Sequence, residues 1–355
     1  MGVSGRVDGV DGAGVRGGPA GGAGEEPAAG RGSVLAVDAG NSKTDVAVIG
    51  ADGSVLGAAR GGGFQPPKVG IGPALDTLER AVTEAASAAG LPVRDLADQV
   101  SACLANADLP VEERELARAV RERGWGRTTR VRNDTFAVLR AGLPGGAPPR
   151  GVAVVCGAGI NCAGLLPDGR TARFPAVGRL SGDWGGGSGL SEEALWLAAR
   201  AEDGRGEPTE LARTLPGHFG LGSMDELIEA LHLGRIPFAG RYELTPVLFE
   251  TCTAGDAVAA SVVDRLAEEV VLLATVALER LGLLGEETPV VLGGSVLAAR
   301  HPRLDGRIRV LMAARAPKAV VGVVTAPPVL GAGLLGLDQA GANARAYTRL
   351  AAHYA

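Results

Sequence analysis

The residues from Asp38 to Asp45, Asp-Ala-Gly-Asn-Ser-Lys-Thr-Asp, have the composition of a phosphate-binding turn. They join two apolar runs, so the sequence predicts a β-hairpin whose first strand ends at Asp38. Backbone N–H groups and tip side chains can donate hydrogen bonds to a phosphate, and the Asp38 carboxylate can face a magnesium ion. The pattern lacks the G-x-x-x-x-G-K-[ST] spacing of a helix-linked phosphate loop, and polar turns between ordinary strands look similar. The residues predicted to hold phosphate at this tip are Gly40, Asn41, Ser42, Lys43 and Thr44.

The same pattern returns in the second half of the chain. An apolar strand at 151–155 is followed by a small-residue tip, a returning strand at 160–166, an Asp-Gly turn and a third strand at 170–174. In the first half the equivalent third strand is predicted at 54–60. A repeat of a whole supersecondary unit predicts two similar lobes, each with a glycine-bearing tip that faces a shared cleft. The second tip adds the candidate phosphate-binding residues Gly157, Ala158 and Gly159.

A third glycine-bearing junction follows a short apolar strand at 289–292. The strand runs into Gly293, Gly294 and Ser295, which open a helix. Such a strand–turn–helix unit lets a flat ligand or a phosphate approach the backbone at the positive end of the helix. These three residues therefore join the candidate ligand-binding set.

Asp134 is a candidate for acid–base chemistry. It lies in Arg132-Asn133-Asp134-Thr135, where a strand at 129–132 gives way to a helix. Aspartate at such a junction is commonly a helix N-cap. A carboxylate at a strand end can also act as a general base toward a substrate hydroxyl that attacks a γ-phosphate. Both roles are compatible, because capping would orient the carboxylate.

Asp183 precedes Trp184 and a run of glycines that leads into a helix at 190–200. The run predicts unusual backbone geometry or a close approach to a ligand, although a flexible surface loop has the same composition. Trp184 weighs against that alternative, because an exposed tryptophan among glycines needs a stacking partner. Asp183 is therefore a candidate contact to a substrate hydroxyl.

Composition limits the class of protein. The chain has 355 residues, of which 46% are hydrophobic, and it is long enough for two domains. A net charge of −5 disfavours nucleic acid as a partner. No charge-free apolar run reaches the about 18 residues of a membrane span. The four cysteines lack C-x-x-C spacing and predict free thiols in a cytoplasmic enzyme.

The order of the expected elements predicts an α/β chain in two lobes. Residues 1–32 are interpreted as a disordered Gly/Ala-rich tail or a misassigned start, and not as a signal peptide. The turn-rich segment 142–150 marks the expected lobe boundary. The expected parts are an N-terminal lobe at 33–146, a C-terminal lobe with a helical insertion at 147–340, and a C-terminal segment at 341–355. Helices are expected at 73–89, 111–123, 257–281 and 329–337, the last with glycines that permit close helix packing.

Together these motifs resemble those of the actin, hexokinase and heat-shock ATPase superfamily, and within it the BadF/BadG/BcrA/BcrD ATPase family. That family includes N-acetylglucosamine kinases and activators of reductases and dehydratases. The resemblance covers 34–338. It rests on the ordered set Asp38–Asp45, Asn133-Asp134, Cys156–Asn161, Gly182-Asp183 and Leu292–Ser295. It implies two similar ribonuclease H-like lobes, in the actin-like ATPase fold, with a nucleotide cleft between them.

The resemblance also implies ATP and Mg²⁺ as cofactors and a small sugar-like acceptor as substrate. Asp38 would lie near the metal, both tips would hold the β- and γ-phosphates, and Gly293 and Gly294 would lie against adenosine. Asp134 would be the general base, and closure of the lobes would exclude water. The implied substrate contacts are Gln65, Asn133, Asn161 and Asp183.

The acceptor side departs from the N-acetylglucosamine kinases, which usually carry Asn where Gln65 aligns, Thr where Ala158 lies and Trp near Val177. The sequence therefore leaves another amino sugar, a sugar or a cyclitol open. An activator ATPase and a non-catalytic nucleotide-binding regulator are the alternative functions. The activator needs exposed cysteines for a shared iron–sulfur cluster, whereas Cys156 and Cys162 fall on predicted buried strands. No helix-turn-helix segment supports the regulator, and a homodimer stays open.

Overall fold

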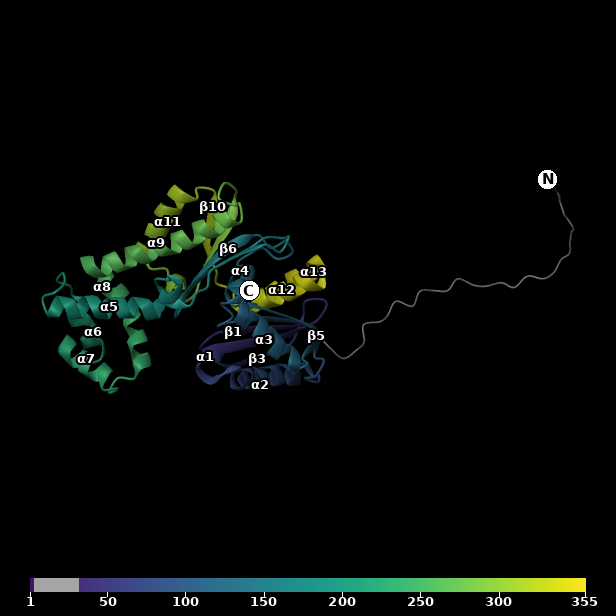
Figure 1. The fold of residues 1–355 in the computed structure, drawn as a ribbon, viewed down its shortest axis with the longest axis horizontal. Coiled ribbons are helices and arrows are strands. Elements are labelled where there is room, and N and C mark those ends of the chain that lie inside the picture. Colours follow the sequence, from purple (N-terminus) through teal and green to yellow (C-terminus); the bar gives the residue numbers. More distant parts are fainter. Residues whose placement is uncertain (3–31) are drawn as a thin grey trace. The chain divides into compact units, whose positions relative to one another are not determined.

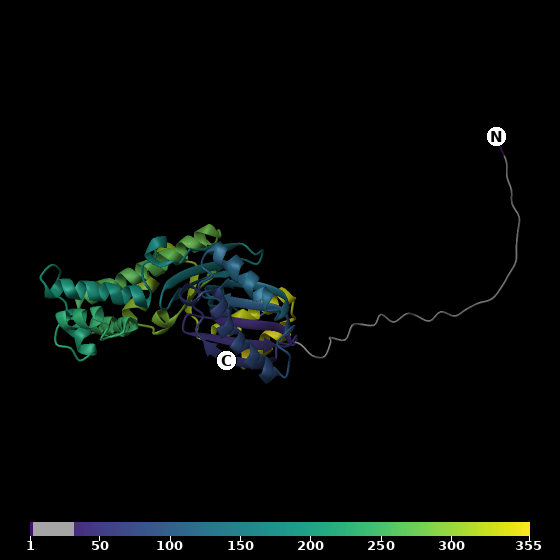
Figure 2. The ribbon, with the colours of Figure 1, turned by 60° about the horizontal axis from the view of Figure 1, so that its bottom comes forward.

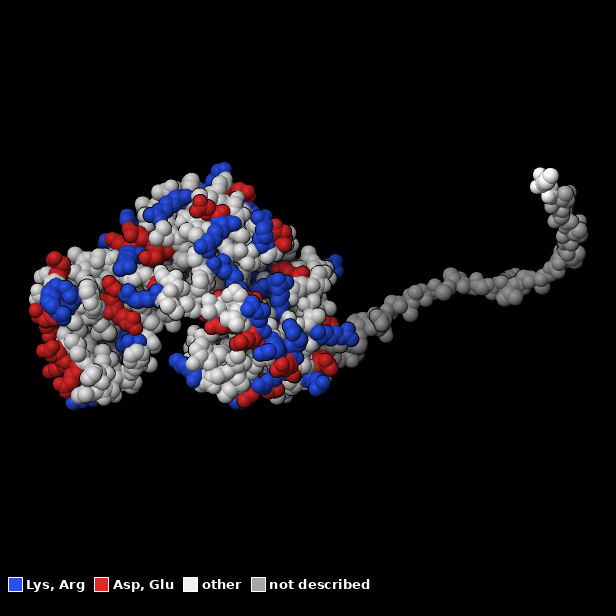
Figure 3. All heavy atoms as spheres, in the orientation of Figure 1, with Lys and Arg blue, Asp and Glu red and all other residues white. Residues whose placement is uncertain are grey.

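The computed structural model describes residues 1–2 and 32–355, and the predicted tail at 1–32 lies almost wholly outside these residues (Figure 1). Residues 32–355 belong to one compact unit, and positive and negative side chains are interspersed over the face that Figure 3 shows. Two five-stranded mixed sheets with flanking helices build this unit.

The first sheet holds the strands of the N-terminal half. Its order is β3-β2-β1-β4-β5, with β1, β4 and β5 parallel and with β2 and β3 added antiparallel. The predicted hairpin is formed by β1 and β2, which places Asp38 opposite Asp45. Because parallel strands end at the same edge of a sheet, the residues that follow β4 and β5 lie at the edge where Asp38 lies. The strands are β1 (Gly32–Ala39), β2 (Lys43–Ile49), β3 (Val55–Gly62), β4 (Ala97–Leu104) and β5 (Gly126–Asn133).

The second sheet repeats this plan. Its order is β10-β9-β6-β7-β8, with β6, β9 and β10 parallel and with β7 and β8 added antiparallel. Strands β6 to β10 thus take the places of β1 to β5, which confirms the internal repeat predicted from the sequence. The strands are β6 (Gly151–Cys156), β7 (Ile160–Leu165), β8 (Thr171–Arg173), β9 (Thr288–Gly293) and β10 (Ala319–Val323).

Helices α2 and α3 share a hydrophobic core with the first sheet. Apolar residues recur at helical spacing along α2, so that Leu75, Leu78 and Val82 are buried against the strands. Helix α3 begins with a proline, and the Glu112 carboxylate accepts the N–H groups of Asp108 and Leu109 that precede it. The helices of this half are α1 (Pro66–Val69), α2 (Ile71–Ala89) and α3 (Pro110–Glu122).

A helical insertion separates β8 from β9. Helices α5 to α8 pack on one another, and α9 joins them to the second sheet (Figure 1). In the part of the chain that the structure describes, no helix has the length and apolar character that a bilayer crossing requires. The insertion contains α5 (Gly186–Glu202), α6 (Leu211–His218), α7 (Met224–His232), α8 (Leu244–Thr253) and α9 (Ala257–Arg280), with 3₁₀ turns η1 (Gly178–Ser181) and η2 (Phe238–Glu243). Helices α10 (Ser295–Ala298) and α11 (Pro302–Arg315) follow β9.

Two helices each follow a strand of one sheet but pack against the other sheet. Helix α4 (Thr135–Ala141) follows β5 but packs against β6 and β7, whereas α12 (Pro328–Ala340) follows β10 but packs against β1, β2 and β4. Figure 2 shows α12, in yellow, beside the purple and blue strands of the first sheet. The two helices also contact each other closely: a Cβ atom on Gly331 would lie 1.8 Å from the carbonyl oxygen of Ala137. The prediction that glycines near 329–337 permit tight helix packing is confirmed.

Element boundaries shift by a few residues from those expected. Helix α2, for example, begins at Ile71, two residues ahead of the expected start at position 73. The C-terminal segment contains an additional helix, α13 (Ala344–His353), whose N-terminus is capped by Asn343. Helix α12, which the division at 147–340 groups with the second lobe, contacts the first sheet. The lobe boundaries themselves stay a prediction.

Candidate functional site

A cavity of about 670 Å³ contacts three of the predicted glycine-bearing motifs. Ser42 of the first tip, Gly157 and Ala158 of the second tip, and Ser295 after β9 all line it. A volume of this size falls within the range of small-molecule and cofactor pockets. Residues of the helical insertion and of the α10–α11 connection close its other side: Tyr242, Thr245, Pro246, Phe249, Arg300, His301 and Pro302.

The first tip is a tight turn held by polar contacts. The Gly40 N–H donates to the Lys43 carbonyl at 2.9 Å, and the Gln65 side-chain amide donates to the Asn41 carbonyl at 2.5 Å. Asn41, Ser42 and Lys43 are exposed, so their donors are available to a ligand. Thr44 is different, because it is buried and its hydroxyl donates to the Gly62 carbonyl at 2.8 Å. Thr44 thus braces the hairpin.

The second tip lies against the N-terminus of α5. The N–H groups of Gly187 and Ser188 donate to the carbonyls of Gly157 and Ala158 at 2.7 and 3.0 Å. Gly186 has a φ of +72°, and a Cβ there would lie 2.5 Å from Gly159. The glycine run after Trp184 therefore has the unusual backbone geometry that the sequence predicted, and its close approach is to the second tip of the chain itself. The positive end of α5 adds favourable potential for an anion beside this tip.

Of the three residues at the junction after β9, Gly293, Gly294 and Ser295, only Ser295 lines the cavity. A Cβ on Gly293 would lie 2.4 Å from Val138, and one on Gly294 would lie 2.4 Å from the Cys156 carbonyl oxygen. Gly294 also has a φ of +84°. Both glycines are thus needed for packing against α4 and β6, and neither lines the cavity.

Asp38 is a buried carboxylate at the end of β1. Burial raises its pKa to about 8, and the neighbouring Asp134 and Asp45 carboxylates add to the rise. Among the described residues, no group of three or more His, Cys, Asp or Glu side chains forms a metal cage. Mg²⁺ requires no such cage, since one or two carboxylates and substrate phosphates commonly hold it. A divalent cation beside Asp38 would relieve the repulsion between these carboxylates, so the site fits the predicted metal.

Asp134 stands directly after β5, at the N-cap position of α4. Its side chain makes no capping hydrogen bond; the Thr135 N–H donates to the Asn133 side-chain oxygen at 3.0 Å. Asp134 thus occupies the N-cap position, while the side-chain hydrogen bond to the first turn comes from Asn133. Burial raises the pKa of the Asp134 carboxyl to about 6. The backbone N–H groups of Thr135 and of Asp134 itself act in the opposite direction and lower this pKa.

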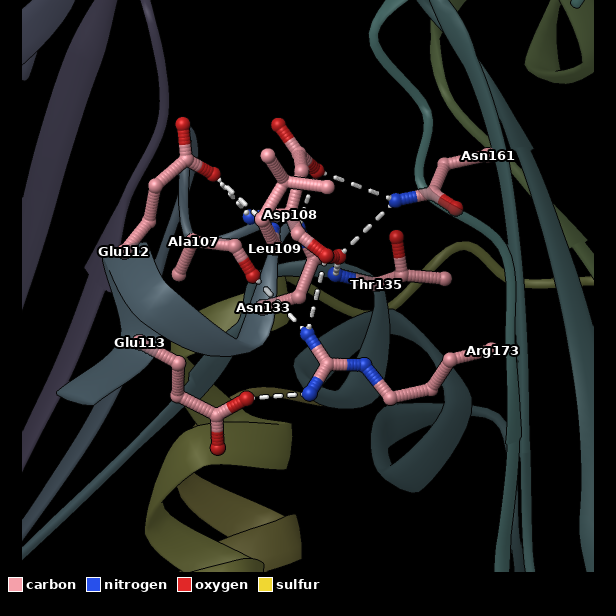
Figure 4. A network of polar contacts seen from close by, with 9 residues as sticks. All are labelled: Ala107, Asp108, Leu109, Glu112, Glu113, Asn133, Thr135, Asn161 and Arg173. Carbon is pink, nitrogen blue, oxygen red and sulfur yellow. Dashed lines mark hydrogen bonds and ion pairs between the residues drawn. The ribbon is translucent and has the colours of Figure 1, made fainter. Parts of the chain in front are cut away.

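Asn133 and Asn161 converge on Asp108, a residue that the sequence patterns did not single out (Figure 4). The Asn133 amide donates to the Asp108 carboxylate at 2.8 Å, and the Asn161 amide donates to the same oxygen at 3.4 Å. Asn161 also donates to the Asn133 side-chain oxygen at 3.1 Å. Asn161 lies on β7, whereas the other two residues belong to the first half. The triad therefore joins the two sheets beside Asp134.

Arg173 of β8 reinforces this connection. It forms an ion pair with Glu113 of α3 and donates to the Ala107 carbonyl at 2.9 Å (Figure 4). Burial raises the pKa of Asp108 to about 7, and Asp134 and Glu112 contribute in the same direction, while Arg173 lowers it. The site thus contains three carboxyl groups with pKa values raised toward neutrality: Asp38, Asp108 and Asp134.

Asp183 lines a second, smaller cavity of about 200 Å³ together with Gly159 and Ser188 of the neighbouring tip region. Its carboxylate accepts the Gly178 N–H at 3.0 Å and the Ser181 hydroxyl at 2.6 Å, which fixes the η1 turn. Trp184 is buried and stacks with the Arg265 guanidinium, 4.2 Å from the ring centre. The stacking partner that the sequence required is thus a protein side chain.

Of the four predicted substrate contacts, Asn133 and Asn161 meet through Asp108, Gln65 braces the first tip, and Asp183 lines the smaller cavity. Asp108 was missed although it lies near the carboxyl end of a parallel strand, as Asp38 and Asp134 do; that position was the available signal. The aromatic residues Tyr242 and Phe249 of the large cavity carry no sequence signal, since they lie in the helical insertion.

A sequence model of the BadF/BadG/BcrA/BcrD ATPase family matches residues 35–305. An N-acetylmuramic acid/N-acetylglucosamine kinase from Clostridium acetobutylicum is 25% identical over 267 residues, which span 74% of this chain and 85% of that protein. An N-acetyl-D-glucosamine kinase from Dictyostelium discoideum is 27% identical over 210 residues, 59% of this chain and 65% of that protein.

A solved structure has the same fold. The crystal structure of a candidate N-acetylglucosamine kinase from Chromobacterium violaceum superposes with a TM-score of 0.65 at 23% identity, covering 85% of this chain and 98% of that one. Together with the repeated sheet order, this likeness confirms the predicted fold of two ribonuclease H-like lobes.

Proposed function

The chain belongs to the BadF/BadG/BcrA/BcrD ATPase family, and we propose that it is an ATP-dependent kinase of a sugar or amino sugar. The observation that carries the proposal is the convergence of both tips and Ser295 on one nucleotide-sized cavity, with the Asp134 carboxylate at the adjoining strand edge. The relatives named as kinases of N-acetylated amino sugars support this substrate class.

ATP binds in the large cavity under this proposal. The exposed donors of Asn41, Ser42 and Lys43, and the second tip with the positive end of α5 behind it, hold the β- and γ-phosphates. The nucleoside lies toward Tyr242 and Phe249, whose rings offer apolar surface for a base. Backbone contacts fix both tips before a ligand arrives, which lowers the ordering cost of binding.

Asp134 is the general base. As the acceptor hydroxyl oxygen attacks the γ-phosphorus, its proton passes to an Asp134 carboxylate oxygen, and ADP leaves with the bridging oxygen. A pKa of about 6 keeps most of this carboxyl ionised above neutral pH and close enough to neutrality to accept a proton. Asn133, Asn161 and Asp183 orient the acceptor.

Asp38 and the β- and γ-phosphates would hold Mg²⁺. The ion supplies charge neutralisation for the phosphates when it is bound. Beside it, Lys43 contributes a cation whose amino group lies 3.7 Å from the Asp45 carboxylate.

The alternative activator function requires cysteines that can reach a shared cluster. All four cysteines of the chain are buried, in β4, β6, β7 and α8. Burial also raises the pKa of the Cys103, Cys156 and Cys162 thiols, which opposes thiolate ligation. These features favour the kinase.

The test is acceptor-dependent ADP release across a panel of amino sugars, with Asp134→Asn as the variant and Asp225→Asn, on the exposed face of α7, as the control. We expect Asp134→Asn to lose roughly 10²–10⁴ of kcat with little change in the KM for ATP. Equal rates for the parent and Asp134→Asn would refute the base assignment. ATP hydrolysis independent of every acceptor, in a protein that contains iron, would refute the kinase.

A further inference from the structure

A cavity of about 400 Å³ lies away from the three motifs that line the nucleotide-sized cavity. Strand β5, the 146–149 connection, the β7–β8 turn, and helices α12 and α13 enclose it. Its polar side chains are Arg130, Arg132, Asp338, Gln339 and Tyr347. The walls of the cavity therefore come from both halves of the chain.

Arg130 and Arg132 are two positions apart on β5, so their side chains point to the same face of the sheet. Arg132 is half-buried, and its guanidinium makes no hydrogen bond or ion pair with any residue that the structure describes. Arg130 likewise has no such partner among residues 32–355. Burial lowers the pKa of Arg132, and the like charge of Arg130 lowers it further, while Cys103, Glu113 and Asp338 act in the opposite direction. Both guanidinium groups keep part of their surface in water and lack a hydrogen-bond acceptor among residues 32–355, so their donors are available to an anion in this cavity.

The one carboxylate in the wall does not supply that anion. Asp338 accepts two hydrogen bonds from Arg140, at 2.8 and 3.0 Å, and Arg140 is fully buried. The charge of Asp338 is therefore balanced by Arg140. Gln339 adds a further donor, because its side-chain nitrogen is buried and has no acceptor within the described part of the chain. Donors and positive charge exceed acceptors in this cavity.

We propose that this cavity binds a phosphate group, either as inorganic phosphate or as the phosphate of a small monoester. Two guanidinium groups on one strand face match the several oxygens of a phosphate, since each can donate two parallel hydrogen bonds. The volume admits a sugar-sized group beyond the phosphate, which the apolar walls at Pro148 and Leu335 would contact. The site is separate from the tips that the proposed function uses, and it does not depend on that function.

A ligand in this cavity can affect the candidate active site, because β5 runs from the cavity wall to that site. Arg132 directly precedes Asn133, which contacts Asp108, and Asp134 follows. The β7–β8 turn in the wall leads to Arg173, which contacts Ala107 and Glu113. A phosphate held between these elements therefore stabilises the arrangement in which both sheets contact Asp108.

Calorimetric titration of inorganic phosphate and of glucosamine 6-phosphate tests the proposal. The full chain is first saturated with Mg²⁺ and a non-hydrolysable ATP analogue, so that the tips are covered. The parent should bind one phosphate group, and Arg132→Gln should weaken it at least tenfold, because a charge-assisted pair is lost. The matched control is Arg127→Gln, an exposed arginine at the start of the same strand, which should bind as the parent does. Tighter binding of the ester than of the free ion identifies the monoester as the source; the reverse order identifies inorganic phosphate.

The proposal is overturned if the saturated parent binds neither probe up to about 10 mM, an affinity too weak to specify a site. Equal affinity of the parent and Arg132→Gln also overturns it, because phosphate then binds elsewhere. Melting curves check that the variants fold. Should Arg132→Gln fail to fold, Arg130→Gln decides, since Arg130 is exposed and its loss leaves the core intact.

Discussion

Replacement of Asp108 tests whether the contact between the two sheets sets the geometry of the site. Asp108→Ala removes the acceptor of the Asn133 amide at 2.8 Å and of the Asn161 amide at 3.4 Å. The two asparagines keep their mutual bond of 3.1 Å. The change thus cuts the link to the β4–α3 connection and leaves the partners in place.

The expected magnitude comes from these contacts. Above about pH 7, where Asp108 is ionised, the 2.8 Å bond is made to a charged group and is worth about 1.5–3 kcal/mol, whereas the longer bond adds little. A loss of about 2 kcal/mol in the transition state lowers kcat/KM for the acceptor about 30-fold. The KM for ATP should stay unchanged, because Asp108 does not line the large cavity. Acceptor-dependent ADP release measured against both substrates separates these effects.

Asp108→Asn is the matched variant, because it keeps an oxygen acceptor for Asn133 and removes the charge. The folded-state pKa of Asp108, about 7, lies above the ordinary value of 3.8. Between about pH 4 and 7 the folded chain therefore holds a proton that the unfolded chain has released, and stability falls as pH rises through this window. Above pH 7 the penalty is complete. Asp108→Asn lacks it, so its melting temperature relative to the parent should increase from pH 5 to pH 8.

Two results would refute this reasoning. Asp108→Ala with an acceptor kcat/KM close to that of the parent would show that the hydrogen bonds do not position the site. A melting-temperature difference between Asp108→Asn and the parent that stays constant with pH would show that Asp108 titrates normally in the folded chain. The exposed Asp225→Asn variant provides the baseline for both measurements.

Three further predictions concern the coupling of α4, α12 and the carboxylates. Gly331→Ala should destabilise the chain by at least about 1–3 kcal/mol in urea unfolding, because its Cβ would lie 1.8 Å from a backbone oxygen. Gly306→Ala, in α11 with open space around it, should instead add about 0.5–1 kcal/mol; equal effects would contradict the packing argument. Arg140→Ala should cost about 3–5 kcal/mol, and the double change with Asp338→Leu should cost less than the single change if the unpaired carboxylate is the cause. Asp134→Asn should lower the pKa of Asp108, followed by carboxyl ¹³C shifts; an unchanged value would mean that the two groups do not interact.

The repeat of the hairpin was the part of the fold that sequence could predict most firmly. Alternating apolar runs, small-residue tips and Asp-Gly turns are local signals, and they recur in the same order in both halves. No local sequence signal predicts that α4 and α12 each pack on the sheet of the other half. Apolar glycine-containing helices can pack on either sheet, and the partner is decided by contacts between distant segments, such as Gly336 against Val34 of β1 and Gly331 against Ala137 of α4.

The site was predictable where chemistry depends on one segment and not where it depends on contacts between segments. Asp38, the two tips and Asp134 each lie at the end of a strand and stand out locally. Asp108 sits in Asn-Ala-Asp-Leu-Pro, which is typical of a turn before a helix. Its importance comes from Asn133 and Asn161, which are 25 and 53 positions away. Thr44 is the opposite case. The local sequence predicted a phosphate contact, but the Thr44 hydroxyl donates a hydrogen bond to the Gly62 carbonyl.

The contacts between the sheets differ in kind, and this difference limits how the site can open. At α4 and α12 the contact is apolar and includes a backbone approach at Gly331, so separation there would expose core and break close packing. At the site the contacts are the Asp108 triad and the Arg173–Glu113 pair, both partly accessible to water. Water can replace such hydrogen bonds, so that breaking them costs less than exposing the apolar core at α4 and α12. We therefore expect entry of an acceptor and release of its product to break the polar contacts first, while α4 and α12 stay packed.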